Sequence, residues 1–170
     1  MPESQQPEAG AALVAQAILS RPSCRVLDVG AGTGKWGKLL RGGVGHLIAV
    51  EVHAPHTATL RGLYDEVEHC NVLELSRTDF DTVILGDVLE HLEHYDALRL
   101  VPWLKEHASR IFLTIPVTVC LQDGAKLGNI HETHRYQWSD KELRALDFEL
   151  FHVGTNPNGT VAIGAYQWLE

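Results

Sequence analysis

Residues 26–34 read Val-Leu-Asp-Val-Gly-Ala-Gly-Thr-Gly, and the other elements of the chain can be placed around them. The mainly apolar segment up to Val29 is typical of a strand buried on both faces of a parallel sheet. Glycines then occupy every second position, which predicts a tight turn into a helix beginning near Lys35. Such a turn brings bare backbone next to the N–H groups of a helix start, where a ligand can bind. We therefore expect a ligand site directly after this strand.

The composition is that of an ordinary globular domain. The chain has 170 residues, of which 45% are hydrophobic and 21% charged, enough for one domain with a substantial core. We expect a flexible tail over residues 1–8 and a single domain over residues 9–170. The formal net charge is −8 at pH 7, without any run of Lys or Arg. This charge argues against a nucleic-acid partner and against an anionic membrane surface.

The cysteines and the first residues bear on location. Cys24, Cys70 and Cys120 are odd in number and lack a C-x-x-C spacing. They favour reduced thiols over a disulfide framework or a zinc site. The first ten residues lack the apolar segment of a signal peptide, and no apolar run approaches the ~20 residues of a membrane-spanning helix. We expect a cytoplasmic protein, either a monomer or a homodimer.

Strand and helix patterns alternate up to residue 115. Expected helices cover residues 9–20, 35–41, 55–64, 88–107 and 139–146. The fourth of these is expected to break near Tyr95-Asp96. Expected strands cover residues 25–29, 46–52, 66–70, 81–85 and 110–115, followed by 148–153 and 160–168, which Asn156-Pro157-Asn158-Gly159 joins as a hairpin. This order predicts an α/β fold, a three-layer Rossmann-like sandwich around a mostly parallel seven-stranded sheet with a C-terminal antiparallel hairpin strand.

Ligands of such sheets bind outside the carboxyl ends of the strands. The residues expected at these ends are Gly30, Glu51, Asn71, Asp87 and Pro116. The longest irregular stretch, residues 117–137, follows the last parallel strand, and long loops of this kind are often functional.

The glycine spacing excludes two common nucleotide sites. A phosphate-binding P-loop would need glycine at Val29 and Ser or Thr at Trp36. A dinucleotide fingerprint would need its third glycine at Lys35.

The segment 28–34 closely resembles motif I of the class I S-adenosylmethionine-dependent methyltransferases, and the resemblance extends over residues 26–168. Residues 80–92, Phe-Asp-Thr-Val-Ile-Leu-Gly-Asp-Val-Leu-Glu-His-Leu, resemble motif IV of that family with its Glu-His pair. The resemblance implies S-adenosylmethionine as cofactor. Glu51 would then hold both ribose hydroxyls, as a carboxylate can, and Asn71 would read the adenine amino group where the family often has Asp. The implied cofactor-binding residues are Asp28, Gly30, Ala31, Gly32, Gly34, Glu51, Val52, Asn71, Val72, Gly86 and Asp87.

Acids and histidines from two segments are expected to converge where the methyl group points. Asp87, Glu90 and His91 would share a face of a first helical turn, and His134 lies near the end of the long loop. In one interpretation no metal is bound, and His91 or His134 acts as a general base with Glu90 nearby. In the other, all four side chains are candidate ligands of a divalent metal.

The metal interpretation is also supported by a resemblance. The spacing is similar to that of small-RNA 3′-terminal 2′-O-methyltransferases and of ubiquinone-pathway O-methyltransferases, although Asp87 and Gln137 stand where the former have Glu. The Gly-Lys-Trp-Gly at residues 34–37, together with Gly128-Asn129, His134 and Trp138, resembles uncharacterised small bacterial methyltransferases.

The expected function is in-line methyl transfer to a hydroxyl (or amine) of a small-molecule, glycan or lipid-linked acceptor, most simply as an O-methyltransferase. Two alternatives stay open. One is a metal-dependent 2′-O-methyltransferase-like enzyme acting on RNA ends or vicinal hydroxyls, and the other is a non-catalytic S-adenosylmethionine-binding module. Base methylation of nucleic acid is disfavoured, because Thr114-Ile115-Pro116-Val117 is not the Asn/Asp-Pro-Pro-aromatic signature.

Overall fold

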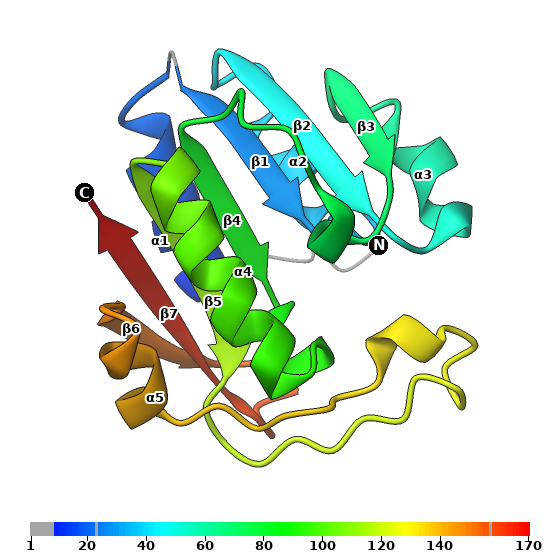
Figure 1. Ribbon diagram of the computed structural model, residues 1–170, viewed down its shortest axis with the longest axis vertical. Helices are drawn as coiled ribbons and strands as arrows, with labels where there is room; N and C mark the ends of the chain where they lie inside the picture. The colour runs from blue at the N-terminus through cyan, green and yellow to red at the C-terminus, as the bar shows by residue number, and fades with distance from the viewer. Residues whose placement is uncertain (1–8, 23, 157) are drawn as a thin grey trace, which may run out of the picture.

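The computed structural model describes residues 9–22, 24–156 and 158–170. Its centre is a seven-stranded sheet of strand order β3-β2-β1-β4-β5-β7-β6 (Figure 1). The first five strands pair in parallel, and β7 pairs antiparallel with β5 and β6. This confirms the predicted fold class; the tail predicted over residues 1–8 lies outside the described residues. The strands are β1 (Arg25–Val29), β2 (His46–Glu51), β3 (Glu66–His69), β4 (Thr82–Gly86), β5 (Arg110–Pro116), β6 (Glu149–Thr155) and β7 (Ala162–Leu169).

Helices cover both faces of the sheet. The α-helices among the described residues are α1 (Ala9–Leu19), α2 (Lys35–Leu40), α3 (Ala54–Leu60), α4 (His94–His107) and α5 (Asp140–Ala145). Side chains of α1, α2 and α3 pack in one core cluster, and those of α4 and α5 pack in the other. Figure 1 shows α4 across the front of the sheet, with α1 and α2 behind it. Among the described residues, no helix combines the length and apolar character needed to cross a membrane.

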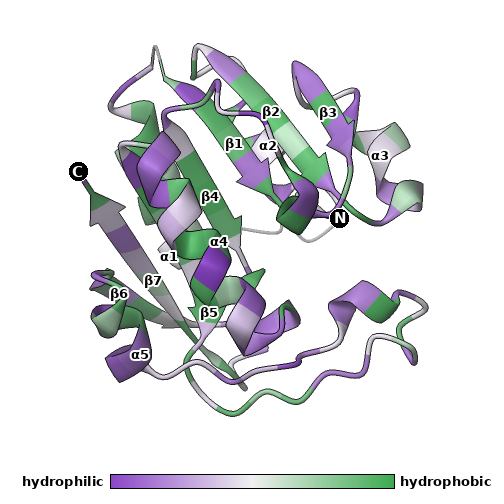
Figure 2. Ribbon diagram, viewed as in Figure 1, coloured by the Kyte–Doolittle hydropathy of each residue, from purple (hydrophilic) through white to green (hydrophobic). Residues whose placement is uncertain are grey.

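Covering both faces explains the apolar sequence of the central strands. In β1, Val26 belongs to the cluster of α1 and α2, whereas Leu27 and Val29 belong to the cluster of α4. Both sides of the strand are thus buried, and near-continuous apolar runs are what buried parallel strands require. Figure 2 shows β1, β2 and β4 as largely hydrophobic at the centre of the sheet.

A long irregular segment, residues 117–139, connects β5 to α5 and contains the 3₁₀ turn η3 (Ile130–Glu132). It swings out past the carboxyl ends of the strands and returns (Figure 1). On its return, the backbone N–H groups of Arg135 and Tyr136 donate to the carbonyl oxygen of Glu90, at 2.7 and 3.2 Å. This backbone clamp places the end of the segment beside the 3₁₀ turn η2 (Leu89–His91) that follows β4.

One predicted break is misplaced. The helical region after β4 is interrupted at residues 92–93, not at Tyr95-Asp96. The interruption arises because Glu93 has an extended backbone (φ −61°, ψ 141°) and caps α4, which begins at His94. Asp96 therefore lies in the first turn of α4, where a carboxylate interacts favourably with the positive end of the helix dipole.

Other predicted boundaries shift by a few residues. The helix expected over residues 55–64 ends at Leu60, and the last strand begins at Ala162 rather than Thr160. The late start of β7 has a local cause: the side-chain oxygen of Asn156 accepts the backbone N–H groups of Thr160 and Val161, at 2.8 and 3.2 Å. These two residues therefore complete the hairpin turn instead of joining the strand.

Candidate active site

The first cavity, of about 360 Å³, lies at the carboxyl ends of the parallel strands. It opens directly onto the glycine turn: Gly32 has φ +54°, and a Cβ built on it would meet no other atom closer than 3.8 Å. Bare backbone thus borders the cavity, as a closely approaching ligand requires. Seven of the predicted cofactor-binding residues line this cavity: Gly30, Gly32, Glu51, Val52, Asn71, Val72 and Asp87.

Glu51, the last residue of β2, supports the glycine turn. Its carboxylate accepts the backbone N–H of Gly32 through Oε2 and that of His53 through Oε1, both at 2.7 Å. The residue is 5% exposed, so both charge-assisted hydrogen bonds are shielded from water. The carboxylate therefore positions the turn as well as lining the cavity, a role that no local sequence pattern indicates.

Asn71 follows β3 and lines the same cavity. Its side-chain oxygen accepts the backbone N–H of Leu73 at 3.0 Å and caps the 3₁₀ turn η1 (Val72–Glu74). An amide oxygen has two lone pairs, so this cap is compatible with a second hydrogen bond to a ligand. The cap orients the amide at the wall of the cavity.

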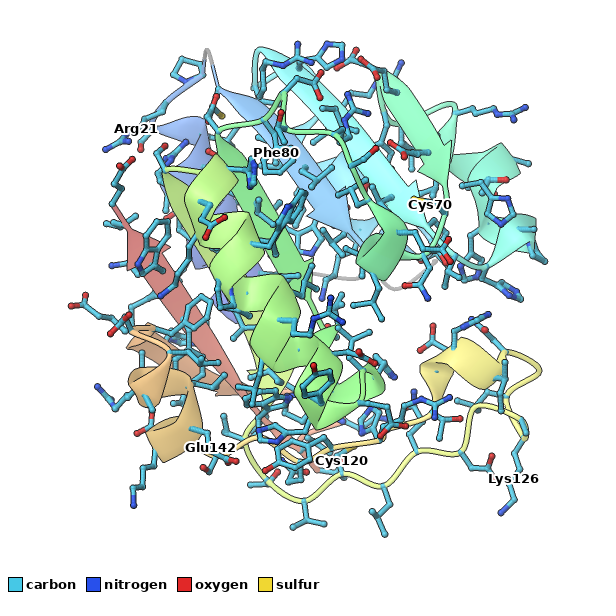
Figure 3. All side chains as sticks on the ribbon, in the orientation of Figure 1. Arg21, Cys70, Phe80, Cys120, Lys126 and Glu142 are labelled. Carbon is cyan, nitrogen blue, oxygen red and sulfur yellow. The ribbon has the colours of Figure 1, made fainter. Side chains whose placement is uncertain are left out.

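The second cavity, of about 330 Å³, lies beyond the ends of β4 and β5 and under the irregular segment. Its walls include Gly86, Glu90 and His134. Figure 3 labels Cys70, which lines the first cavity after β3, and Cys120, which lines the second on the irregular segment. The two cavities have a common wall, made by Gly30, Gly32, Asp87, His91 and Glu132.

The remaining predicted cofactor residues lie outside the first cavity. Ala31 and Gly86 line the second cavity. Gly34 has φ +81° and stands against Leu63 on the far side of the turn. Asp28 is fully buried and accepts a hydrogen bond from the hydroxyl of Tyr64.

Glu90, His91 and His134 converge in the second cavity. One ligand atom of each lies within 4.8 Å of the others, and the two imidazole ring centroids are 4.8 Å apart. His91 Nδ1 lies 3.2 Å from the carbonyl oxygen of Thr133, and His134 Nδ1 lies 2.6 Å from that of Cys120. Because a carbonyl only accepts, each neutral ring carries its proton on Nδ1 and keeps a lone pair on Nε2.

Glu90 is the most unusual group of the site. It is 3% exposed, and neither carboxylate oxygen has a hydrogen-bond partner among the described residues. Burial, with a further contribution from the nearby Asp87, raises the pKa of Glu90 well above its ordinary value. Burial also lowers the pKa of His91, which keeps its imidazole neutral near pH 7.

The helical turn expected from Asp87 onward does not form. Asp87 has φ +57°, and the 3₁₀ turn begins only at Leu89. The Asp87 carboxylate instead pairs with the Lys35 ammonium at 3.0 Å. The Asp87 side chain therefore lies at the common wall of the cavities. Of the four predicted metal ligands, the structure brings together the other three, Glu90, His91 and His134.

Asp28 provides a stability prediction. Burial raises its pKa to about 7; Tyr64 and Lys35 oppose the shift, and Glu51 adds to it. The unfolded pKa is about 3.9, so between these values the folded state binds more protons and stability falls as pH rises. Asp28→Asn, which removes the titrating group, is expected to flatten this decline by up to about 4 kcal/mol. Urea unfolding of the wild type and of Asp28→Asn from pH 4 to 8 measures how the free energy of unfolding depends on pH. Parallel pH profiles of the two proteins would contradict the prediction.

Comparison with known proteins agrees with this architecture. Residues 27–101 match a family model described as a methyltransferase domain. The search of curated proteins found no significant match. Among solved structures, magnesium protoporphyrin IX methyltransferase from Synechocystis PCC 6803 with bound SAH superposes with a TM-score of 0.70 and 17% identity, covering 95% of this chain and 84% of the other.

Two further structures have the same fold. YcgJ from Bacillus subtilis gives a TM-score of 0.70 at 14% identity, covering 95% of this chain and 97% of that one. The 1,6-didemethyltoxoflavin-N1-methyltransferase of Burkholderia thailandensis, with bound 1,6-didemethyltoxoflavin and S-adenosylhomocysteine, gives a TM-score of 0.69 at 21% identity. The match covers 96% of this chain and 80% of that one. The chain thus has the fold of these methyltransferases, and the methyltransferase-domain match over residues 27–101 supports the predicted family and its S-adenosylmethionine cofactor.

Proposed function

We propose that the first cavity binds S-adenosylmethionine and that the second binds the methyl acceptor, a hydroxyl (or amine) of a small-molecule, glycan or lipid-linked compound. The observation that carries this proposal is the common wall, since five residues line both cavities. A methyl donor in one cavity and an acceptor in the other would meet there. This juxtaposition is what in-line transfer between two bound molecules requires.

The cofactor supplies an activated methyl group, whose bond to sulfur breaks as the acceptor attacks, with the electron pair staying on sulfur. The chain supplies alignment and exclusion of water. Glu51 and the glycine turn hold the donor side, and Glu90, His91 and His134 face the acceptor. In its neutral form each imidazole presents an Nε2 lone pair to the cavity, which suits a group that takes up a proton from the acceptor.

The acceptor cavity of about 330 Å³ suits a small organic molecule or one end of a larger compound. Two structurally similar enzymes are named for organic acceptors, magnesium protoporphyrin IX and 1,6-didemethyltoxoflavin. A non-catalytic binding module would have no use for Glu90, because a buried carboxylate without a partner is costly to maintain. We also propose a cytoplasmic location, which the unpaired cysteines Cys24, Cys70 and Cys120 support; monomer and homodimer both remain predictions.

The test combines cofactor binding with methyl transfer. We expect His134→Asn to bind S-adenosylmethionine as the wild type does but to lose about 10²–10⁴-fold in turnover, the usual contribution of a group acting on the reacting atoms. Calorimetry gives the affinity, and transfer of labelled methyl to a panel of hydroxyl and amine acceptors gives the turnover.

The control is His107→Asn at the end of α4, where Nδ1 of His107 also faces a carbonyl oxygen, that of Trp103, at 2.7 Å. This imidazole lines neither cavity, so the cofactor affinity and the turnover of His107→Asn are expected to equal those of the wild type. Full turnover in both His91→Asn and His134→Asn would overturn the assignment of the second cavity. Failure of the wild type to bind S-adenosylmethionine would overturn the proposal as a whole.

A further inference from the structure

We propose that the second cavity selects an amine as the methyl acceptor, and that Glu90, His91 and His134 hold this amine as its ammonium ion through three N–H hydrogen bonds. The three side chains are those that converge in the second cavity. The inference narrows the proposed function, on which its transfer step rests, to methylation of the nitrogen of an organic amine. Binding of the ammonium group does not itself depend on the methyl donor.

All three side chains present hydrogen-bond acceptors to the second cavity. The Nδ1–H of each neutral imidazole faces a carbonyl oxygen, that of Thr133 or that of Cys120, so each ring keeps its Nε2 lone pair for a ligand. Both oxygens of Glu90 are buried without a hydrogen-bond partner among the described residues. A hydroxyl has one donor and could serve one of the three groups, whereas an ammonium has three donors and no acceptor. The cluster therefore matches the donors of an ammonium.

The distances also fit one ammonium nitrogen. Its N–H bonds point in tetrahedral directions, and N–H hydrogen bonds are about 2.9 Å long, so the acceptors around one ammonium nitrogen lie about 4.7 Å apart. One oxygen or nitrogen atom of each of the three side chains lies within 4.8 Å of the others. The three side chains are thus close enough together for a single ammonium nitrogen to reach all of them.

The charges on the walls of the second cavity favour a cation. Asp87, Glu90 and Glu132 line it together with Lys35, and the Lys35 ammonium pairs with the Asp87 carboxylate at 3.0 Å. The carboxylates of Glu90 and Glu132 therefore give this wall an excess of negative charge. Glu90 is 3% exposed, and a carboxylate buried so deeply is costly unless it is paired. A bound ammonium would supply this pair, which a neutral acceptor would not.

Other walls of the second cavity suit the carbon skeleton that carries the amine. They include the apolar side chains of Trp36, Pro116, Val161 and Ile163. An organic group packed against them would exclude water from the ammonium end. Hydrogen bonds and charge interactions with Glu90 would then be stronger than in water.

The transfer step balances in atoms and electrons. The ammonium gives one proton to Nε2 of His91, which lines both cavities, and the lone pair left on nitrogen faces the common wall. The two remaining N–H groups keep their hydrogen bonds to Glu90 and His134. The lone pair forms the bond to the methyl carbon, the bond from that carbon to sulfur breaks, and its electron pair stays on sulfur. The products are the methylated ammonium ion and S-adenosylhomocysteine, and the proton leaves His91 for solvent.

The test titrates the chelator-treated protein with methylammonium, methanol and tetramethylammonium. Methylammonium has a positive charge and three N–H donors, methanol is neutral with one donor, and tetramethylammonium has the charge without any N–H. Binding is followed through the imidazole nitrogen resonances of His91 and His134 in NMR spectra, assigned with His91→Asn and His134→Asn. We expect methylammonium to bind about 10-fold or more tightly than either other probe, since one hydrogen bond to a charged group contributes about this factor.

Two variants and a matched control locate the site. Glu90→Gln removes the negative charge and should weaken methylammonium binding by about 10-fold or more, and His134→Asn, which removes one acceptor, by a similar factor. Glu66→Gln makes the first change on β3, in a residue that lines neither cavity, and should leave the affinity for methylammonium unchanged. Calorimetric binding of S-adenosylmethionine on the same samples shows that each variant is folded.

The outcomes separate the amine site from the proposed function. If the wild type binds S-adenosylmethionine but binds methylammonium no more tightly than methanol, the amine site is overturned and the proposed function stands. The same holds if both variants bind methylammonium as the wild type does, or if labelled methyl is transferred to hydroxyl compounds and to no amine. Binding of methylammonium by a protein that does not bind S-adenosylmethionine would overturn the proposed function and leave the ammonium site standing.

Discussion

The Glu51→Gln variant is expected to bind S-adenosylmethionine about 100-fold more weakly than the wild type. In the wild type, the Glu51 carboxylate accepts the backbone N–H of Gly32, and it is proposed to accept the ribose hydroxyls as well. The amide offers one acceptor oxygen in place of two and turns an N–H₂ group toward donors. Hydrogen bonds to a charged group contribute about 1.5–3 kcal/mol each, and the loss of one or two accounts for the expected factor.

Calorimetric titration with S-adenosylmethionine and S-adenosylhomocysteine measures this effect. Glu66→Gln is a matched control, since Glu66 lies at the opposite end of a neighbouring strand, β3, and lines neither cavity. It should retain wild-type affinity. An unchanged affinity in Glu51→Gln would mean that the first cavity does not hold the ribose, and the assignment of the two cavities would have to be abandoned.

Trp138→Ala is expected to lower the free energy of unfolding by about 3–5 kcal/mol, as removal of a large aromatic side chain from a core does. Trp138 is 1% exposed and joins the core cluster on the α4 side of the sheet. Its ring also contacts those of His94 and Tyr136, with centroids 5.1 and 5.2 Å away. The residue therefore anchors the end of the irregular segment, four positions after His134.

Urea unfolding followed by far-ultraviolet circular dichroism measures the change. Tyr95→Ala is the comparison, because Tyr95 is 69% exposed and surface substitutions usually stay within about 0.5 kcal/mol. If Trp138→Ala were no less stable than Tyr95→Ala, the irregular segment would owe its position to the hydrogen bonds at Glu90 and not to packing.

The strands could be predicted from local pattern because both faces of the sheet are covered. Val26, Leu27 and Val29 must all be apolar in such a strand, and positive φ angles at Gly30, Gly32 and Gly34 account for the glycine spacing. The break before α4 could not be located from the sequence. Glu93 is not a typical N-cap residue, and it accepts no backbone N–H through its side chain, so no local signal marks it.

The site was predictable only in part, because spacing assumes a regular backbone. Regular helical spacing places Asp87 beside Glu90 and His91 on one turn. A left-handed backbone at Asp87 turns its carboxylate toward Lys35 instead. Likewise, nothing in the local sequence shows that Glu51 accepts the N–H of Gly32, since the two lie 19 positions apart.

By itself, the sequence determined the α/β fold and the order of its elements, and it predicts S-adenosylmethionine as the methyl donor. These depend on short-range patterns: apolar runs, a glycine turn and strand ends that carry one or two polar residues. Only the tertiary structure decided which side chains line the second cavity. The carbonyl oxygen of Thr133 contacts the imidazole of His91, 42 positions away in the chain. The backbone clamp on Glu90 brings His134 beside His91. Such contacts depend on how the irregular segment folds back over the sheet, which local propensity does not specify.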